Sequence, residues 1–154
     1  MKAGVRALGI AESFRGDEST LAGAVVRASR VTDGFVAGIA PAWFNLLDLP
    51  AIRESADRPV LSVTFEESPG LEGALREAFE GDALDERLAV YRRQPERRRL
   101  TVNDERVFVR AVGCEEDEAA DVVRAFTPEG GRPEPLRVAR LAARAADDAF
   151  VAEG

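Results

Sequence analysis

Hydrophobic runs interrupted by polar and turn-forming residues divide the chain into its expected elements. Three short apolar runs open the sequence, at residues 5–10, 21–26 and 31–39. The segment between the first two, which contains Gly16 and Asp17, predicts a polar loop. Short connections between such runs favour antiparallel neighbours in a sheet. Because the runs hold few polar residues, we expect both faces of that sheet to be covered.

The middle of the chain predicts helices on either side of one strand. Residues 47–56 fit a short helix with Pro50 in its first turn, where proline is tolerated. Residues 59–65 form a β-branched run between a proline and acidic residues, which favours a strand. Two amphipathic helices are expected to follow, with Gly81 just past the end of the first and Asp82 as the N-cap of the second.

The last part of the chain predicts a strand pair and two helices. A hairpin is expected to join residues 100–102 and 107–112, with its turn at Asn103-Asp104. The two helices are expected at residues 115–126 and 134–151. Strands first, then alternating helices and strands, then helices indicate one α/β or α+β domain that comprises the whole chain, residues 1–154.

The composition excludes several classes of site. There is no histidine, so a Ser-His-Asp triad, a Cys-His pair and imidazole-bound zinc are ruled out. A single cysteine, Cys114, cannot form an internal disulfide, which makes a cytoplasmic location the default. No apolar run approaches the roughly 18 residues of a membrane span, and the first residues lack the apolar core of a signal peptide. Any catalysis would use carboxylates, arginines or hydroxyls, together with a metal that prefers oxygen ligands.

The charge is unusual in sign and in kind. Acidic residues number 28 against 21 basic ones, for a net charge of −7, and Lys2 is the sole lysine beside 20 arginines. This excess of acid fits an ordinary solubility charge, and it also fits adaptation to a very salty cytoplasm, where screening removes self-repulsion. Five arginines crowd into eight residues and suggest either a phosphate-binding strip or a charged loop: Arg92, Arg93, Arg97, Arg98 and Arg99.

Three stretches of the sequence together resemble one family. They are Arg6-Ala7-Leu8-Gly9-Ile10-Ala11-Glu12-Ser13 with the apolar run at 21–27, Trp43-Phe44-Asn45-Leu46-Leu47-Asp48 running into 59–63, and residues 107–113 followed by Pro133-Glu134-Pro135-Leu136-Arg137. They resemble the archaeal domain-of-unknown-function family 99, also known as endonuclease dU, over nearly the whole chain. That family is similar to endonuclease V, so the resemblance implies a ribonuclease H-like mixed sheet flanked by helices. The match also suggests a shortened member of haloarchaeal type.

The resemblance implies a metal-dependent DNA endonuclease that acts on deaminated bases such as uracil or inosine. In such folds acidic residues at strand ends hold Mg²⁺ or Mn²⁺, which activates water at the scissile phosphodiester. The resemblance assigns metal binding and catalysis to Glu12 and Asp48. Where family members have two aspartates after the first strand, however, this chain has Ala11 and Glu12, and alanine cannot bind a metal.

Each candidate residue also has a purely structural interpretation. Glu12 fits an exposed strand end, and Asp48 fits a helix cap. Asn45, Glu134 and Arg137 are candidates for substrate binding, but a bond between Glu134 and Arg137 would also tie the last helix to the sheet. Cys114 lies among acidic residues, which raise a thiol pKa and argue against a nucleophile.

A second departure from the family concerns the sheet. The helix, strand and acidic cluster that family members carry after the third strand are missing here, because residues 33–35 pass almost directly into 39–43. We therefore expect a smaller sheet in which the first strand pairs directly with residues 59–65, and homo-oligomer formation is a further expectation. Three functions remain open: a DNA repair nuclease, a non-catalytic nucleic-acid-binding or protein-interaction domain, and a truncated remnant.

Overall fold

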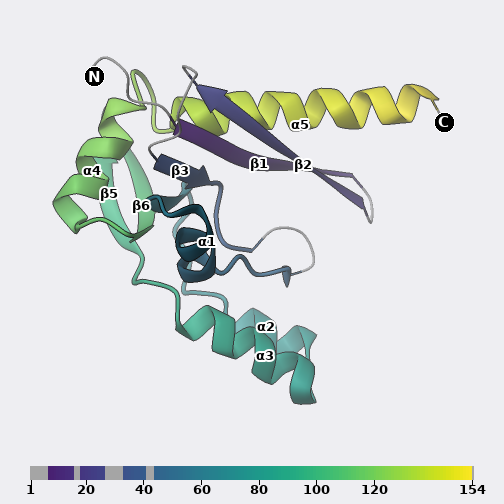
Figure 1. Ribbon diagram of the computed structural model, residues 1–154. Coiled ribbons are helices and arrows are strands. Elements are labelled where there is room, and N and C mark those ends of the chain that lie inside the picture. The colour runs from purple at the N-terminus through teal and green to yellow at the C-terminus, as the bar shows by residue number, and fades with distance from the viewer. Residues whose placement is uncertain (1–6, 16–17, 27–32, 41–43, 154) are drawn as a thin grey trace.

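The fold is seen in a computed structural model that describes residues 7–15, 18–26, 33–40 and 44–153 (Figure 1). The described strands are β1 (Ala7–Arg15), β2 (Glu18–Val26), β3 (Asp33–Val36), β4 (Val60–Thr64), β5 (Arg98–Val102) and β6 (Glu105–Val112). The described helices are α1 (Leu49–Ala56), α2 (Glu72–Ala78), α3 (Gly81–Arg92), α4 (Glu116–Ala125) and α5 (Glu134–Glu153).

The strands form one mixed sheet in the order β2-β1-β3-β4-β6-β5. β1 runs antiparallel to β2, and β6 runs antiparallel to both β4 and β5. β3 lies between β1 and β4 and is parallel to both. The predicted α/β class with a mixed, helix-flanked sheet is therefore confirmed.

Two expectations about the first strands are wrong. The third apolar run is not an antiparallel neighbour of the others, and β1 does not pair with β4. Instead β3 separates them, with Gly9 opposite Phe35 and Phe35 opposite Leu61. Phe35 and Val36 are almost fully buried, so this short apolar strand can take the central place and pair its backbone on both sides.

The hairpin of β1 and β2 is longer than the apolar pattern predicts. β1 continues through Ala11 to Arg15, and β2 begins at Glu18, so most of the predicted polar loop is paired strand. The register runs from Ala7 opposite Val26 to Arg15 opposite Glu18. Each strand pairs its backbone groups with those of the other, which allows the hairpin to extend beyond the apolar run.

The two faces of the sheet bury different residues of the same strands. In β4, Leu61 and Val63 belong to a core cluster that includes residues of α4 and α5, whereas Val60 belongs to a second cluster with Leu49 of α1. Alternation with a period of two along a strand places successive side chains on opposite faces. α1 therefore covers one face, and α4 with the start of α5 covers the other, while α5 continues alongside the β1–β2 hairpin (Figure 1).

The other elements lie close to where the sequence predicts them. α1, β4, α4 and α5 start within two residues of their predicted positions, and the hairpin turn at Asn103-Asp104 has positive φ at both residues, 49° and 66°. Two predicted boundary residues are wrong. α2 ends at Ala78 with Phe79 as its C-cap, so Gly81 does not end that helix. α3 begins at Gly81, which has a φ of 59°, so Asp82 lies inside its first turn rather than capping it. Among the described helices, none is long and apolar enough to cross a membrane.

Candidate functional site

A cavity of about 560 Å³ opens where β3 ends. β3 stops at Val36, but β1 continues to Arg15 and β4 to Thr64, and no strand of the described chain fills the space between them. The cavity lies in this gap, at the carboxyl ends of the parallel strands, and we call it the notch cavity. Its walls come from Ala11 and Glu12 of β1, the segment after β3, the end of β4, β6, and the start of α5.

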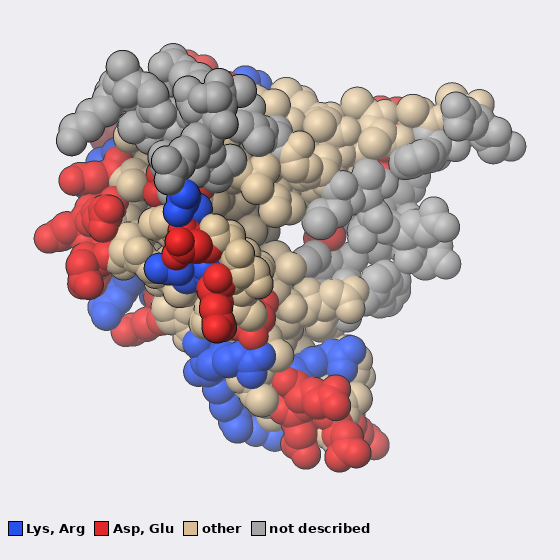
Figure 2. Space-filling view, in the orientation of Figure 1, with Lys and Arg blue, Asp and Glu red and all other residues tan. Residues whose placement is uncertain are grey.

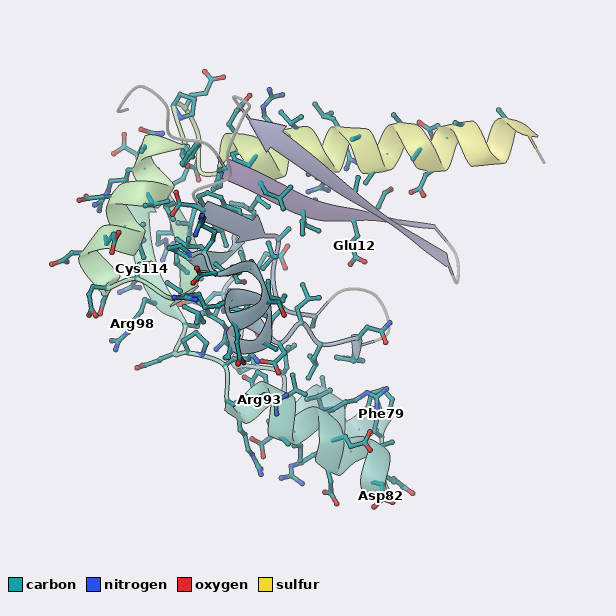
Figure 3. All side chains as sticks on the ribbon, viewed as in Figure 1. Glu12, Phe79, Asp82, Arg93, Arg98 and Cys114 are labelled. Atoms are coloured by element: carbon teal, nitrogen blue, oxygen red, sulfur yellow. The ribbon has the colours of Figure 1, made fainter. Side chains whose placement is uncertain are left out.

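Glu12 is the one predicted metal ligand that lines the notch cavity. Alternation along β1 puts Ala7 against the α4–α5 side and Ile10 against the α1 side, so Glu12 faces away from α5. Figure 3 shows Glu12 projecting from β1 on that side. Ala11 is buried at 4% exposure and also lines the cavity, so the position where the resemblance implies an acid presents a methyl group here.

Asp48 does not line the notch cavity, and its carboxylate is held elsewhere. It is the N-cap of α1, where Oδ1 accepts from the backbone N–H of Ala51 at 3.4 Å. Oδ2 accepts from Nε and Nη2 of Arg93 at 2.8 and 2.5 Å. Hydrogen bonding by Arg93 is the main cause that holds the pKa of Asp48 below its usual 3.8.

Gln94, the single glutamine of the chain, completes this junction between α1 and the end of α3. Its side-chain oxygen accepts from the backbone N–H of Leu49 at 3.0 Å, and its amide donates to the carbonyl of Val90 at 2.8 Å. Nothing in the local sequence pattern indicated this role. The junction shows that the Asn45–Asp48 stretch fixes the entry of α1, which is the structural alternative for Asp48.

Two aromatic residues, Trp43 and Phe44, come just before Asn45, and the structure describes the second of them. Phe44 has a φ of 56° and packs edge-on against Phe79, with ring centroids 6.1 Å apart. Trp43, the residue before it, lies outside the described residues. Asn45 is exposed, and it has an interaction within the structure.

The Pro133–Arg137 stretch anchors α5 through its backbone and prolines. Glu134 and Arg137 form a two-pronged ion pair, with Nε of Arg137 donating to Oε2 at 2.9 Å. This pair lies within the first turn of α5, so it does not tie the helix to the sheet as expected. The tie comes from Pro135, because a Cβ on Gly9 of β1 would lie only 2.0 Å from the Pro135 carbonyl oxygen.

The five arginines of the predicted strip do not act as one group, because their partners and surroundings differ. Arg92 pairs with Glu72 at 2.7 Å, Arg93 pairs with Asp48, and Arg98 pairs with Glu96 at 3.0 Å. Arg99 is exposed on β5. Figure 2 shows a basic patch over the end of α3, where Figure 3 places Arg93, and acidic side chains over α4 and over the rest of the α2–α3 pair.

Arg97 alone of this group lines the notch cavity, where it meets arginines that sequence reasoning missed. The missed residues are Arg110, Arg132 and Arg140. Arg140 lies on α5 between Arg137 and Arg144, at a helical spacing that fits a solvated stripe of arginines. The spacing along a helix does not reveal which member of a stripe points over a strand end, so tertiary structure decides this.

The described residues do not fit the magnesium or manganese site that the family resemblance implies. No group of three or more Asp, Glu, Cys or His side chains that could hold a metal ion occurs among them. Asp48 would first have to give up its bonds to Arg93 and Ala51. Of the two predicted metal ligands, Glu12 lines the notch cavity and Asp48 does not.

The chain matches a family model and curated proteins over most of its length, from β3 onward for the family model. The family model described as endonuclease dU matches residues 35–147. A UPF0215 protein of Thermococcus kodakarensis is 36% identical over 110 residues, which cover 70% of this chain and 54% of that protein. A UPF0215 protein of Methanocaldococcus jannaschii is 30% identical over 113 residues, covering 71% of this chain and 58% of its own length. The chain thus spans about half the length of the curated relatives it matches.

Two solved structures share the fold. A crystal structure of a protein of unknown function from Archaeoglobus fulgidus superposes with a TM-score of 0.79 at 22% identity, covering 92% of this chain and 98% of that one. Endonuclease V of Ciona intestinalis, in complex with DNA containing an inosine, superposes with a TM-score of 0.55 at 11% identity, covering 95% and 87%. At these identities the likeness establishes a common fold and nothing finer.

Proposed function

Because the chain belongs to the endonuclease dU family, we propose that it is a DNA-binding domain that receives deaminated bases, uracil or hypoxanthine, in the notch cavity. The observation that carries this proposal is the position of the cavity. Ligands of open α/β sheets bind in the crevice beyond the carboxyl ends of the strands, and the notch cavity occupies that place beside β1, β3 and β4.

The cavity has the size and lining that a nucleobase requires. Its volume of about 560 Å³ lies within the range of small-molecule pockets. Phe65 and Phe108 provide aromatic surface, although a guanidinium lies over one face of each ring. Ser62 provides a hydroxyl group that can read a base edge. An enzyme or binding protein that reads a damaged base must take that base out of the helical stack into such a pocket.

We propose binding rather than cleavage because of the donor set. A metal-dependent hydrolysis needs several oxygen ligands around one ion, and here Ala11 and the engaged Asp48 remove two of them. Metal-dependent cleavage is the second candidate function, and the specific observation in its favour is the carboxylate of Glu12 at the cavity.

The test compares oligonucleotides that carry one uracil, one hypoxanthine or no damaged base. Fluorescence anisotropy measures affinity with EDTA, and denaturing gels measure cleavage with Mg²⁺ and with Mn²⁺. We expect a preference of about tenfold or more for the damaged DNA in EDTA, and intact strands under every metal condition. A matched control replaces Glu54, an exposed residue of α1, with glutamine and should behave as the wild type.

The alternatives give different results. Equal affinity for damaged and undamaged DNA would overturn the base-binding proposal. Cleavage in Mn²⁺ that disappears in Glu12→Gln but persists in Glu54→Gln would establish the second candidate and place a metal at Glu12. Loss of both binding and cleavage in the well-folded wild type would leave the protein-interaction or remnant alternatives.

A further inference from the structure

Four arginine side chains enter the notch cavity from two sides of the sheet. Arg97 and Arg110 come from the side of α1, since Arg110 alternates on β6 with the buried Val109 of the opposite face. Arg132 and Arg140 come from the side of α5. The charged residues that line the cavity are these four and the acids Glu12 and Glu66, so the lining is net positive in a chain whose net charge is −7.

The guanidinium groups are positioned by neutral partners. Nη2 and Nε of Arg97 donate to Oγ1 of Thr64 at 2.8 and 3.2 Å, and Nη2 also donates to the carbonyl of Glu66. The same guanidinium lies 4.2 Å from the centre of the Phe108 ring. Arg110 donates from Nη1 to the carbonyl of Pro95 at 2.5 Å. Both side chains are therefore held in place, and neither forms an ion pair with a carboxylate of the described residues.

Of the two arginines on the α5 side, Arg132 is positioned by an aromatic ring. The guanidinium of Arg132 lies over the ring of Phe65, 4.2 Å from its centre. Within the part of the chain that the structure describes, none of the four cavity arginines has a carboxylate within 4.0 Å. By contrast, Arg92, Arg93 and Arg98 each have one.

Partial burial and mutual repulsion both disfavour the charged forms of the cavity arginines. Burial lowers the pKa of Arg97, and the charge of Arg110 lowers it further. Burial likewise lowers the pKa of Arg132, with contributions from Arg140 and Arg144. Arginine remains charged in proteins, so these groups stay as poorly hydrated cations that repel one another. A bound anion would remove that repulsion.

We propose that Arg97, Arg110, Arg132 and Arg140 bind a backbone phosphate of a nucleic acid in the notch cavity without a metal ion. The planar guanidinium matches phosphate oxygens through paired N–H donors, which is the reason that arginine dominates such contacts. The inference rests on the proposed function, because it takes DNA as the occupant of the cavity. It adds that arginines neutralise the phosphate at the place where family resemblance expects a metal.

The first measurement titrates the wild type with inorganic phosphate and with a single-stranded oligonucleotide, both in EDTA, and follows arginine Nε–Hε signals by NMR. We expect the signals of Arg97 and Arg132 to shift with both probes, while that of the exposed Arg76, which pairs with Glu72, stays in place. Shifts that appear with oligonucleotide only after Mg²⁺ is added would overturn the proposal. Shifts with free phosphate but none with the oligonucleotide would overturn it as well, since they would identify a site for a small anion.

The second measurement uses variants. Arg97→Gln and Arg132→Gln should each weaken oligonucleotide binding in EDTA about tenfold and reduce the slope of affinity against salt by about one ion. Arg76→Gln should leave both quantities unchanged. Equal affinities for all three variants would contradict the proposal, and thermal unfolding of each variant shows whether it is folded.

The two proposals fail separately. If the phosphate contacts are real but damaged and undamaged DNA bind equally, the base-recognition proposal fails and this inference stands. If damaged DNA is preferred but Arg97→Gln and Arg132→Gln bind like Arg76→Gln, only the phosphate inference fails.

Discussion

At the scale of single residues, the carboxylate of Asp48 has a structural role, because both of its oxygens accept hydrogen bonds within the fold. It accepts from the first turn of α1, and it holds Arg93 at the end of α3. Removing an N-cap of this kind costs about 1 kcal/mol, and an ion pair of this exposure adds no more than about that. The carboxylate thus joins the start of α1 to the end of α3, through two residues that are 45 positions apart in the sequence.

We predict that Asp48→Ala lowers the free energy of unfolding by about 1–2 kcal/mol at neutral pH. The folded-state pKa of Asp48 lies below 3.8, so its contribution is fully present above that value and is lost as the pH falls through the folded pKa. The difference between wild type and variant should therefore shrink in acid. Urea unfolding at several pH values measures it, and Glu54→Ala, on the exposed face of α1, is the control; an equal effect in both variants would contradict the prediction.

Cys114 is expected to be unreactive. Burial and the nearby carboxylates of Glu118, Asp33 and Glu115 raise its thiol pKa to about 11. Because the thiolate is the reactive form, modification by a disulfide reagent at pH 8 should be slower in the folded protein than in denaturant by roughly two orders of magnitude. Equal rates would show that this pKa is not raised.

At the scale of elements, the contact between β1 and α5 explains two of the stretches that carry the family resemblance. Gly9 lets the backbone of Pro135 approach the strand, and Pro133, Pro135 and Leu136 are fully buried beside it. A side chain at Gly9 would collide with backbone atoms, which cannot move aside as a flexible side chain can.

We predict that Gly9→Ala destabilises the fold by roughly 3 kcal/mol, because α5 must shift away from the sheet. Gly23→Ala is the matched control, since it lies in the same hairpin and its added Cβ would come no closer than 3.7 Å to another atom. Thermal unfolding of both variants gives the answer. If Gly9→Ala unfolds at the wild-type temperature, the close approach does not hold α5.

Most elements could be predicted because their signals are local. The β-branched run of β4 and the Asn103-Asp104 turn each specify their structure within a few residues. The neighbours of β3 could not be predicted, because parallel pairing joins segments that are distant in sequence and leaves no local mark. The length of the β1–β2 hairpin was missed for a related reason: the pairing of Ser13, Phe14 and Arg15 with β2 continues beyond the apolar run of residues 5–10.

The same distinction applies to the candidate site. Glu12 and Arg97 could be identified from the resemblance and from the arginine cluster. That Arg97 turns into the cavity depends on Thr64, which is 33 residues away in the sequence and accepts its hydrogen bonds. Arg132 and Arg140 reach the same cavity only because α5 packs on β1.

At the scale of the whole molecule, charge is separated between the surface and the cavity. Acidic side chains gather over α4 and over the part of the α2–α3 pair away from the basic patch at the end of α3 (Figure 2), whereas arginines dominate the charged lining of the notch cavity. The chain as a whole repels DNA, and the cavity attracts it. Salt should therefore act in opposite directions on the fold and on DNA binding.

We predict that adding sodium chloride up to molar concentrations stabilises the fold and weakens DNA binding. Screening shortens the reach of charge from about 10 Å at 0.1 M salt to about 3 Å at 1 M, which relieves the repulsion among the surface acids and also weakens phosphate contacts. A stabilisation of about 1 kcal/mol would raise Tm by roughly 3 °C.

The control neutralises three exposed acids of the α2–α3 region, Glu77, Glu80 and Glu86, as glutamines, which changes the net charge from −7 to −4. This variant should gain less stability from salt than the wild type, yet lose DNA affinity along the same slope, because the cavity arginines are unchanged. A salt-independent Tm in the wild type would favour a plain solubility charge over adaptation to high salt. An identical gain in both proteins would mean that the salt effect comes from apolar burial rather than from surface repulsion.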